Sequence, residues 1–318
     1  IADKTEIAEA QEALTNSILS CRDRVNEDDG FVVYKTLVGY QSVFPPAWEN
    51  DGFEFEEQDA YRNQRIQEFV AQVTEETAEH WLAILKRCAQ TESKDLATFP
   101  SLMDFLECLG RIKPQIMIRY LDRLDRQLAN FLVPMLNGLD QSGSKDFVKD
   151  WIGRNIEEGC YLPQIIWYLR SAGNFDPTTL ETALSVAIKN DDDHAIRNAI
   201  SAATTRYEDS TSDLVERVFL PAIECFKERG DTRWVNAIWP RATENPLFQN
   251  LKNNQAEAVL LAMVHYPQIE YQAEEILTTI AQKYPEMVVE FFGQRLNTSK
   301  EIGSGAQFEA IPFQLHNL

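Results

Sequence analysis

"KPQIMIRYL", residues 113–121, is the stretch that decides the fold, because its order of proline, glutamine and apolar residues recurs along the chain. The recurrences are "LPQIIWYL" at 162–169, "YPQIEYQA" at 266–273 and "YPEMVVEFF" at 284–292. Proline suits the first turn of a helix, since its fixed φ is helical and the amide that it lacks has no intrahelical acceptor there. The pattern therefore predicts a new helix at each of the leading prolines, which are Pro114, Pro163, Pro267 and Pro285.

Apolar residues recur at helical spacing through most of the chain, and strand patterns are nearly absent. The spacing predicts helices near 3–25, 32–43, 57–72, 75–90, 101–112, 114–137, 145–157, 162–172, 177–189, 194–206, 213–229, 232–239, 253–265, 268–283 and 285–296. Most connections are short, so consecutive helices are expected to be antiparallel neighbours. The predicted fold class is all-α, built from irregular antiparallel helix pairs.

Such helix pairs, with prolines at helix starts and irregular spacing between repeats, resemble the HEAT-type α-solenoid class over roughly residues 57–296. TPR and armadillo arrays share the same short apolar-periodic helices. An acidic solenoid of this kind is also similar to the helical-repeat arm of large bacterial STAND-type NTPases. That resemblance implies an arm that senses or binds a partner, although no nucleotide-binding motif of that family is present in this sequence.

The resemblance implies three parts for the chain. Residues 1–56 are expected to be N-terminal helices and an aromatic, acidic loop packed on the solenoid, and residues 57–300 the helical-repeat solenoid itself. Residues 301–318 are expected to be a linker and the start of further structure, because "FEAIPFQLHNL" carries apolar residues that need cover. The first residue is Ile1 and no secretion signal follows it, so we expect a fragment of a larger multidomain protein.

The charge balance limits the kinds of partner. Fifty acidic against thirty basic residues give a formal net charge of −20, which repels nucleic-acid phosphates and anionic lipid. No apolar run approaches the roughly 18 residues that a membrane span needs. Five scattered cysteines without a C-x-x-C pair suit a reducing compartment. We therefore expect a cytoplasmic protein that binds neither nucleic acid nor membrane.

Three consecutive aspartates beside a histidine, Asp191 to His194, raise the possibility of a metal site. A calcium loop of the EF-hand kind would need glycine at the sixth position and glutamate at the twelfth, where this chain has Ile196 and Ala202. The segment instead indicates a helix start, with Asp193 as the capping residue.

Other motifs that resemble catalytic sites also fail in detail. "GLDQSGSKD" from Gly138 approaches a phosphate-binding loop, but Ser144 and Lys145 stand in the reverse of the required order. We interpret it as a turn between helices with Ser144 as the cap. The four histidines lie far apart, and acidic pairs such as Asp104 and Glu107 are common by chance in so acidic a chain. The prediction is no catalytic residue, no metal and no cofactor.

One cluster favours binding, because Arg119, Arg123 and Arg126 step by four and three along one helix face in this acidic chain. They form the candidate partner-binding site for an acidic surface, and the alternative is a solvated face on which Asp122 pairs with Arg126. Met117, Leu124 and Leu128 would lie on the opposite, buried side.

The sequence thus predicts a non-catalytic protein-binding or scaffolding helical-repeat module, whose partner is another protein or another domain of the same chain. A peptide-binding array of TPR type is one alternative. An enzyme with a carboxylate site that matches no motif is another. Exposed aromatic residues in "YQSVFPPAWENDGFEFEE", residues 40–57, would add an interface if they are not packed against the first helices.

Overall fold

The computed structural model describes residues 4–39, 55–93, 98–173, 175–238, 240–302 and 308–312. Every regular element in these ranges is a helix, which confirms the predicted all-α class. The chain divides into two compact units, residues 1–148 and 149–318, and the boundary falls within helix α8 (Lys145–Glu158). The aromatic and acidic loop at 40–54 lies outside the described residues.

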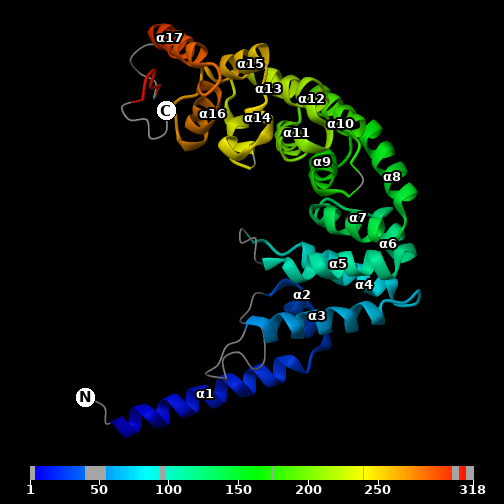
Figure 1. Ribbon diagram of the computed structural model, residues 1–318. Helices are drawn as coiled ribbons and strands as arrows, with labels where there is room; N and C mark the ends of the chain where they lie inside the picture. The colour runs from blue at the N-terminus through cyan, green and yellow to red at the C-terminus, as the bar shows by residue number, and fades with distance from the viewer. Residues whose placement is uncertain are drawn as a thin grey trace. The chain divides into compact units, whose positions relative to one another are not determined.

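The first unit is a two-layered stack of short amphipathic helices (Figure 1). Its elements are α1 (Lys4–Asn26), α2 (Asp29–Val38), α3 (Phe55–Gln72), α4 (Ala78–Ala89), α5 (Pro100–Ile112), α6 (Pro114–Leu121), the 3-10 helix η3 (Leu128–Phe131) and α7 (Leu132–Gln141). In one layer α3 packs on α5 and α5 packs on α7, while in the other α2 packs on α4 and α4 on η3. Within each layer a helix therefore packs on the next helix of the same layer.

Two glycines allow α5 and α7 to approach each other at backbone distance. A Cβ added at Gly138 would lie 2.2 Å from the carbonyl oxygen of Glu107 and 3.0 Å from the Cα of Gly110. Gly138, the first glycine of the loop-like motif, thus lies inside α7 and serves helix packing. The turn that was predicted there follows α7 at residues 142–144, where Gly143 has a φ of +88°.

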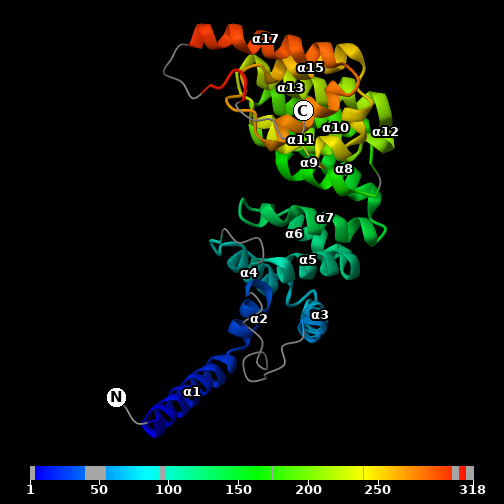
Figure 2. The same cartoon turned by 60° about the vertical axis from the view of Figure 1, so that its left-hand side comes forward.

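The second unit repeats the two-layered arrangement. Its elements are α9 (Leu162–Ser171), α10 (Pro177–Lys189), α11 (Asp193–Thr205), α12 (Tyr207–Leu214), the π-helix η4 (Val215–Phe219), α13 (Leu220–Glu228), the 3-10 helices η5 (Arg233–Ala237) and η6 (Ala242–Glu244), α14 (Pro246–Gln249), α15 (Asn253–Met263), α16 (Tyr271–Ala281) and α17 (Pro285–Ile302). Layer A contains α10, α12 to α13, α15 and α17. Layer B contains α9, α11, the short helices η5, η6 and α14, and α16 (Figures 1 and 2).

Two parts of the predicted helix pattern are wrong. The helix expected at 114–137 ends at Leu121 and resumes as η3 and α7, because the carboxylate of Asp125 accepts the amide of Leu128 at 2.9 Å and starts a new helical segment. Three of the four leading prolines lie in the first turn of a helix, but Pro267 does not. It lies in the loop before α16, which begins at Tyr271.

A buried arginine fastens the described end of the chain to the last helices. Arg295 in α17 is fully buried, and its guanidinium donates to the carbonyl oxygens of Val264 at 2.9 Å, Tyr266 at 2.6 Å and Ala310 at 3.0 Å, and also to that of Glu309. Burial lowers the pKa of Arg295 to about 10. Residues 308–312 thus fold back over the final helices, with the Phe308 ring 4.5 Å from the guanidinium carbon.

We predict that Gly138→Ala lowers the stability of the first unit by about 3 kcal/mol, because the new methyl group meets backbone that cannot turn aside. The urea midpoint measured by circular dichroism checks this. Gly153→Ala in α8 is the matched control, since a Cβ there meets nothing within 4 Å and alanine is the better helix former. Equal midpoints for Gly138→Ala and the wild type would contradict the packing role.

We predict that deleting residues 303–318 destabilises the second unit by about 1–3 kcal/mol, because Arg295 then loses two of its four buried carbonyl acceptors. Thermal unfolding and hydrogen exchange in α15 to α17 measure the effect. Deleting only residues 313–318 is the control, since it keeps Glu309 and Ala310. The role of this contact is disproved if the two truncated chains unfold alike.

Candidate functional site

Two members of the predicted arginine cluster, Arg119 on α6 and Arg123 just after its end, form ion pairs with acidic residues at and just before the start of α4. Arg119 lies 2.6 Å from the carboxylate of Glu75, and Arg123 forms a hydrogen-bonded ion pair with Glu79. The α6 helix is held against α4 by Tyr120, whose buried hydroxyl donates to the carbonyl oxygen of Ala78 at 2.6 Å. Packing of the two helices therefore brings the acids to the arginines.

The pKa values report the pairing of these charges. The hydrogen bond from Arg123 lowers the pKa of Glu79, and the same bond raises the pKa of Arg123. Both side chains are exposed to solvent, so the pair adds little to stability. The ion pair balances the positive charge of Arg123 on the surface of the unit.

Arg126 does not lie on the helix face that was predicted for the cluster. The α6 helix ends at Leu121, so the helical spacing that would pair Asp122 with Arg126 is absent. Arg126 is exposed, Met117 and Leu128 are fully buried as predicted, and Leu124 is half-buried. The binding role of Arg119, Arg123 and Arg126 stays a prediction.

The aspartate run at 191–193 is a helix start with an ionic cluster beside it. The carboxylate of Asp192 accepts the amides of His194 at 3.1 Å and Ala195 at 3.0 Å. The cap is therefore Asp192, and the prediction of Asp193 was wrong by one residue. Asp193 instead lies 2.6 Å from the guanidinium of Arg229, which also pairs with Asp191.

Asp104 and Glu107, the acidic pair noted in the sequence, interact with neighbouring side chains. Burial, followed by the neighbouring carboxylate of Glu107, raises the pKa of Asp104, and Gln141 donates to Glu107 at 2.7 Å. Within the described ranges, no group of three or more histidine, cysteine or acidic side chains has the arrangement to hold a metal ion.

Layer B carries an exposed tryptophan that sequence reasoning did not single out. Trp167 on α9 is 44% exposed, and the guanidinium carbon of Arg170 lies 4.5 Å from the centre of its ring. Arg170 also donates to the hydroxyl of Thr205 on α11 at 3.1 Å, and burial lowers its pKa. The sequence signal was a tryptophan and an arginine three residues apart on one helix, a spacing that places them on one face.

A second aromatic–arginine pair lies at the start of α16. Tyr271 is 50% exposed, and the guanidinium carbon of Arg241 lies 5.1 Å from the centre of its ring. A hydrogen bond with the carboxylate of Glu275 is the main cause that raises the pKa of the Tyr271 hydroxyl. Both exposed aromatic rings on layer B thus lie in cation–π contact with an arginine.

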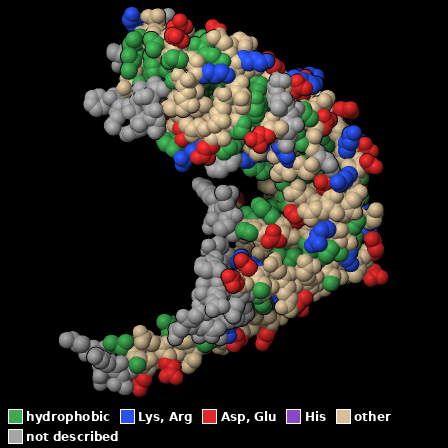
Figure 3. Space-filling model, in the orientation of Figure 1, with side chains coloured by type: hydrophobic (Ala, Val, Ile, Leu, Met, Phe, Trp, Pro, Cys, Tyr) green, Lys and Arg blue, Asp and Glu red, His purple; other side chains and the backbone are tan. Residues whose placement is uncertain are grey.

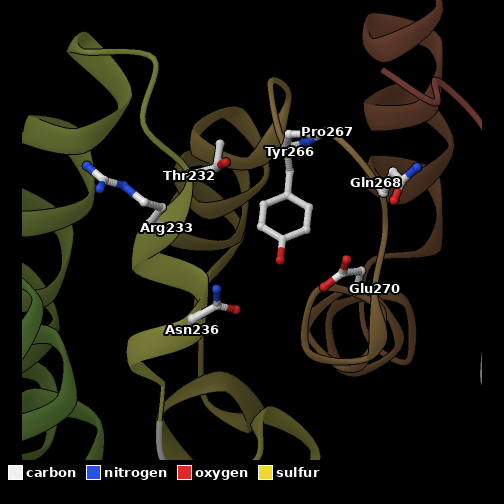
Figure 4. Close-up of a pocket in the computed structure, with 7 residues that line it drawn as sticks. All are labelled: Thr232, Arg233, Asn236, Tyr266, Pro267, Gln268 and Glu270. Carbon is white, nitrogen blue, oxygen red and sulfur yellow. The ribbon is translucent and has the colours of Figure 1, made fainter. Parts of the chain in front are cut away.

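A small cavity of about 230 Å³ lies in layer B (Figure 4). Its lining comes from η5 and the loop before α16, namely Thr232, Arg233, Asn236, Tyr266, Pro267, Gln268 and Glu270. The Tyr266 hydroxyl points between the side chains of Asn236 and Glu270, while Arg233 points away from them. Burial and then Glu270 raise the pKa of Tyr266, so its hydroxyl stays protonated near neutral pH and can donate a hydrogen bond.

Layer A carries charged side chains of both signs. Arg217 in η4 forms an ion pair with Glu181 in α10, and acidic and basic side chains lie interspersed along α8, α10 and α12 in Figure 3. Layer A therefore presents mixed charge, whereas layer B presents the two aromatic–arginine pairs and the cavity.

Comparison with known proteins gives no relative, since no protein-family model, no curated protein and no solved structure matches the chain. In the part of the chain that the structure describes, no helix combines the length and the apolar content needed to cross a bilayer.

We predict that Asp192→Ala lowers stability by about 1 kcal/mol, because two amides at the start of α11 lose their acceptor. Asp150→Ala, an exposed site within α8, is the control and should be neutral or slightly stabilising. Thermal unfolding gives the comparison, and elemental analysis of both proteins tests the alternative. Stoichiometric metal that is present in the wild type and lost in Asp192→Ala would refute a purely capping role.

Proposed function

We propose that the chain is a helical-repeat module of the α-solenoid type that binds a protein partner, or another domain of its own chain, on layer B of the second unit. The observation that carries the proposal is the packing of successive helices within each layer, such as α3 on α5 and α5 on α7, or α9 on α11. Repeat arrays are built in this way, because each unit buries its apolar face only against the next unit.

The α9 and α11 pair supports this interpretation in detail. Asn198 donates to the carbonyl oxygen of Pro163 at 2.8 Å, and Arg170 donates to Thr205 at 3.1 Å. The first bond lies near the start of α9 and the second near its end, so the two helices run parallel and in register. Parallel alignment of equivalent helices is what successive repeats of a solenoid require.

Layer B has the chemistry to hold a polypeptide. Trp167 and Tyr271 offer broad apolar rings with little conformational entropy to lose, and such residues dominate the energy of protein interfaces. The cavity in the same layer offers an amide at Asn236 and a hydroxyl at Tyr266, which can pair with main-chain groups of a partner. A carboxylate or carbonyl group of the partner is the natural ligand for Arg170.

The other predictions from the sequence remain as alternatives to this proposal. A peptide-binding array of TPR type would use the same layer and differ in the length of the bound segment. The enzyme alternative and the likeness to the arm of STAND-type NTPases stay predictions.

We predict that a photoreactive benzoylphenylalanine at position 167 cross-links to one defined protein, or to one defined segment of the parent chain. The same group at position 289 should not, because Val289 is exposed on α17 in layer A. Cross-linking in cells followed by mass spectrometry identifies the adduct.

Arg170→Glu should reduce that adduct at least about tenfold, since it reverses the charge beside Trp167. Arg217→Glu on layer A is the matched control and should leave the adduct unchanged. An adduct at 167 that is indifferent to Arg170→Glu, or an equal adduct at 289, would remove layer B as the binding surface.

A further inference from the structure

The first helix lies almost entirely in solvent although it carries large apolar side chains. In α1, Ile7 is 47% exposed, Leu14 62%, Ile18 43% and Val25 43%. Its half-buried side chains among the described residues are Leu19, Arg22 and Asn26, all in its last two turns. Asn26 pairs with Lys35 of α2, and the earlier turns project away from α2 (Figures 1 and 2).

The exposed apolar residues form a single stripe with the spacing of a coiled coil. Steps of four and three lead along α1 through Ile7, Gln11, Leu14, Ile18, Cys21 and Val25. At 3.6 residues per turn these positions fall within an arc of about 80° on the helix surface. The residues that face α2 lie roughly a quarter turn away, so contact with α2 leaves the stripe open. Figure 3 shows apolar side chains along this helix.

We propose that α1 pairs with α1 of a second copy of this chain as an antiparallel two-helix coiled coil. This surface is separate from layer B and goes beyond the function proposed above. If the two-fold axis passes beside Asn16, Leu14 faces Ile18 of the second copy and Ile7 faces its Val25. Gln11 then faces Cys21. Every exposed large apolar residue of the stripe therefore meets another one, as a self-complementary two-fold interface requires.

The distribution of charge favours the antiparallel direction. The first half of α1 holds one basic and three acidic residues, a net charge of −2, and its second half holds two basic and one acidic residue, a net charge of +1. Antiparallel pairing places the acidic half of one helix beside the basic half of the other. Parallel pairing would set the two acidic halves beside each other, and like net charge there disfavours association.

The exposure of the α1 stripe in the single chain also favours pairing with a second copy. Isolated helices are marginal in water, and a helix in a protein gains most of its stability from packing its apolar face. In α1 the stripe has no cover from the described residues. Pairing with a second copy covers the stripe of both helices at once.

Cysteine cross-linking tests the register with the full chain. Gln11→Cys places a thiol opposite Cys21 of the second copy, so mild oxidation should give a covalent dimer on a non-reducing gel. The dimer should vanish when Cys21→Ser is added. Asn16→Cys, on the opposite face of α1, is the matched control and should stay monomeric on the gel.

The wild type distinguishes the two directions. In the antiparallel register the two Cys21 residues lie about 15 Å apart along the axis and cannot form a disulfide. A Cys21–Cys21 disulfide in the oxidised wild type would show a parallel pair and overturn the proposal.

Association itself is measured by analytical ultracentrifugation over a series of concentrations. Leu14→Glu should weaken dimerisation at least about tenfold, whereas Asn16→Glu should not. Unchanged thermal unfolding shows that the rest of the chain stays folded in both variants. A monomer at every concentration would overturn the proposal. So would a monomeric Gln11→Cys variant whose introduced thiol resists thiol reagents, because another part of the same chain would then cover the stripe.

Discussion

The contact between Gly110 and Gly138 is the constraint on which the first unit depends. Because neither residue has a side chain, the backbones of α5 and α7 come together, and α3 can pack on the other side of α5 in the same layer. The short α6 links α5 to α7, so its position is set by that contact. Tyr120 then contacts Ala78, and Arg119 of α6 and the following Arg123 pair with Glu75 and Glu79. The surface chemistry of this unit follows from one close helix approach.

In the second unit, polar side chains rather than glycines hold neighbouring helices together. Asn198 and Arg170 bind α9 to α11 at both ends, and Asn245, which is fully buried, caps α14 by accepting the amide of Leu247 at 3.0 Å. At the far end of the unit Arg295 satisfies four carbonyl oxygens of irregular backbone at once. Such carbonyl groups are costly to bury unpaired, so one long side chain there replaces the hydrogen bonds that a further helix would have supplied.

Local pattern predicted most of the fold because amphipathic periodicity is a property of each segment alone. The prediction failed where a local hydrogen bond, or a side chain distant in sequence, determined the structure. The helix expected over 114–137 ends at Leu121, and Asp125 accepts the amide that starts the next helical segment at Leu128. The extended entry to α16 displaced the helix start from Pro267. Arg123 pairs with Glu79, a residue 44 positions away, and no spacing rule within one helix indicates such a pair. For the same reason the sequence could not show that Trp167 is exposed while Trp234 is fully buried.

Arg170 differs in its interactions from several other arginines of this acidic chain. Arg119, Arg123, Arg217 and Arg229 pair with carboxylates, and their charge is balanced before a partner arrives. Arg170 has no carboxylate within ion-pair distance among the described residues, and its guanidinium is held between Trp167 and Thr205 instead. An acidic protein repels most anions at long range, so recognition of an acidic group must rely on a short-range, preorganised cation. In the function proposed above, Arg170 is suited to this role, because its guanidinium stacks on Trp167 and burial has already removed part of its hydration.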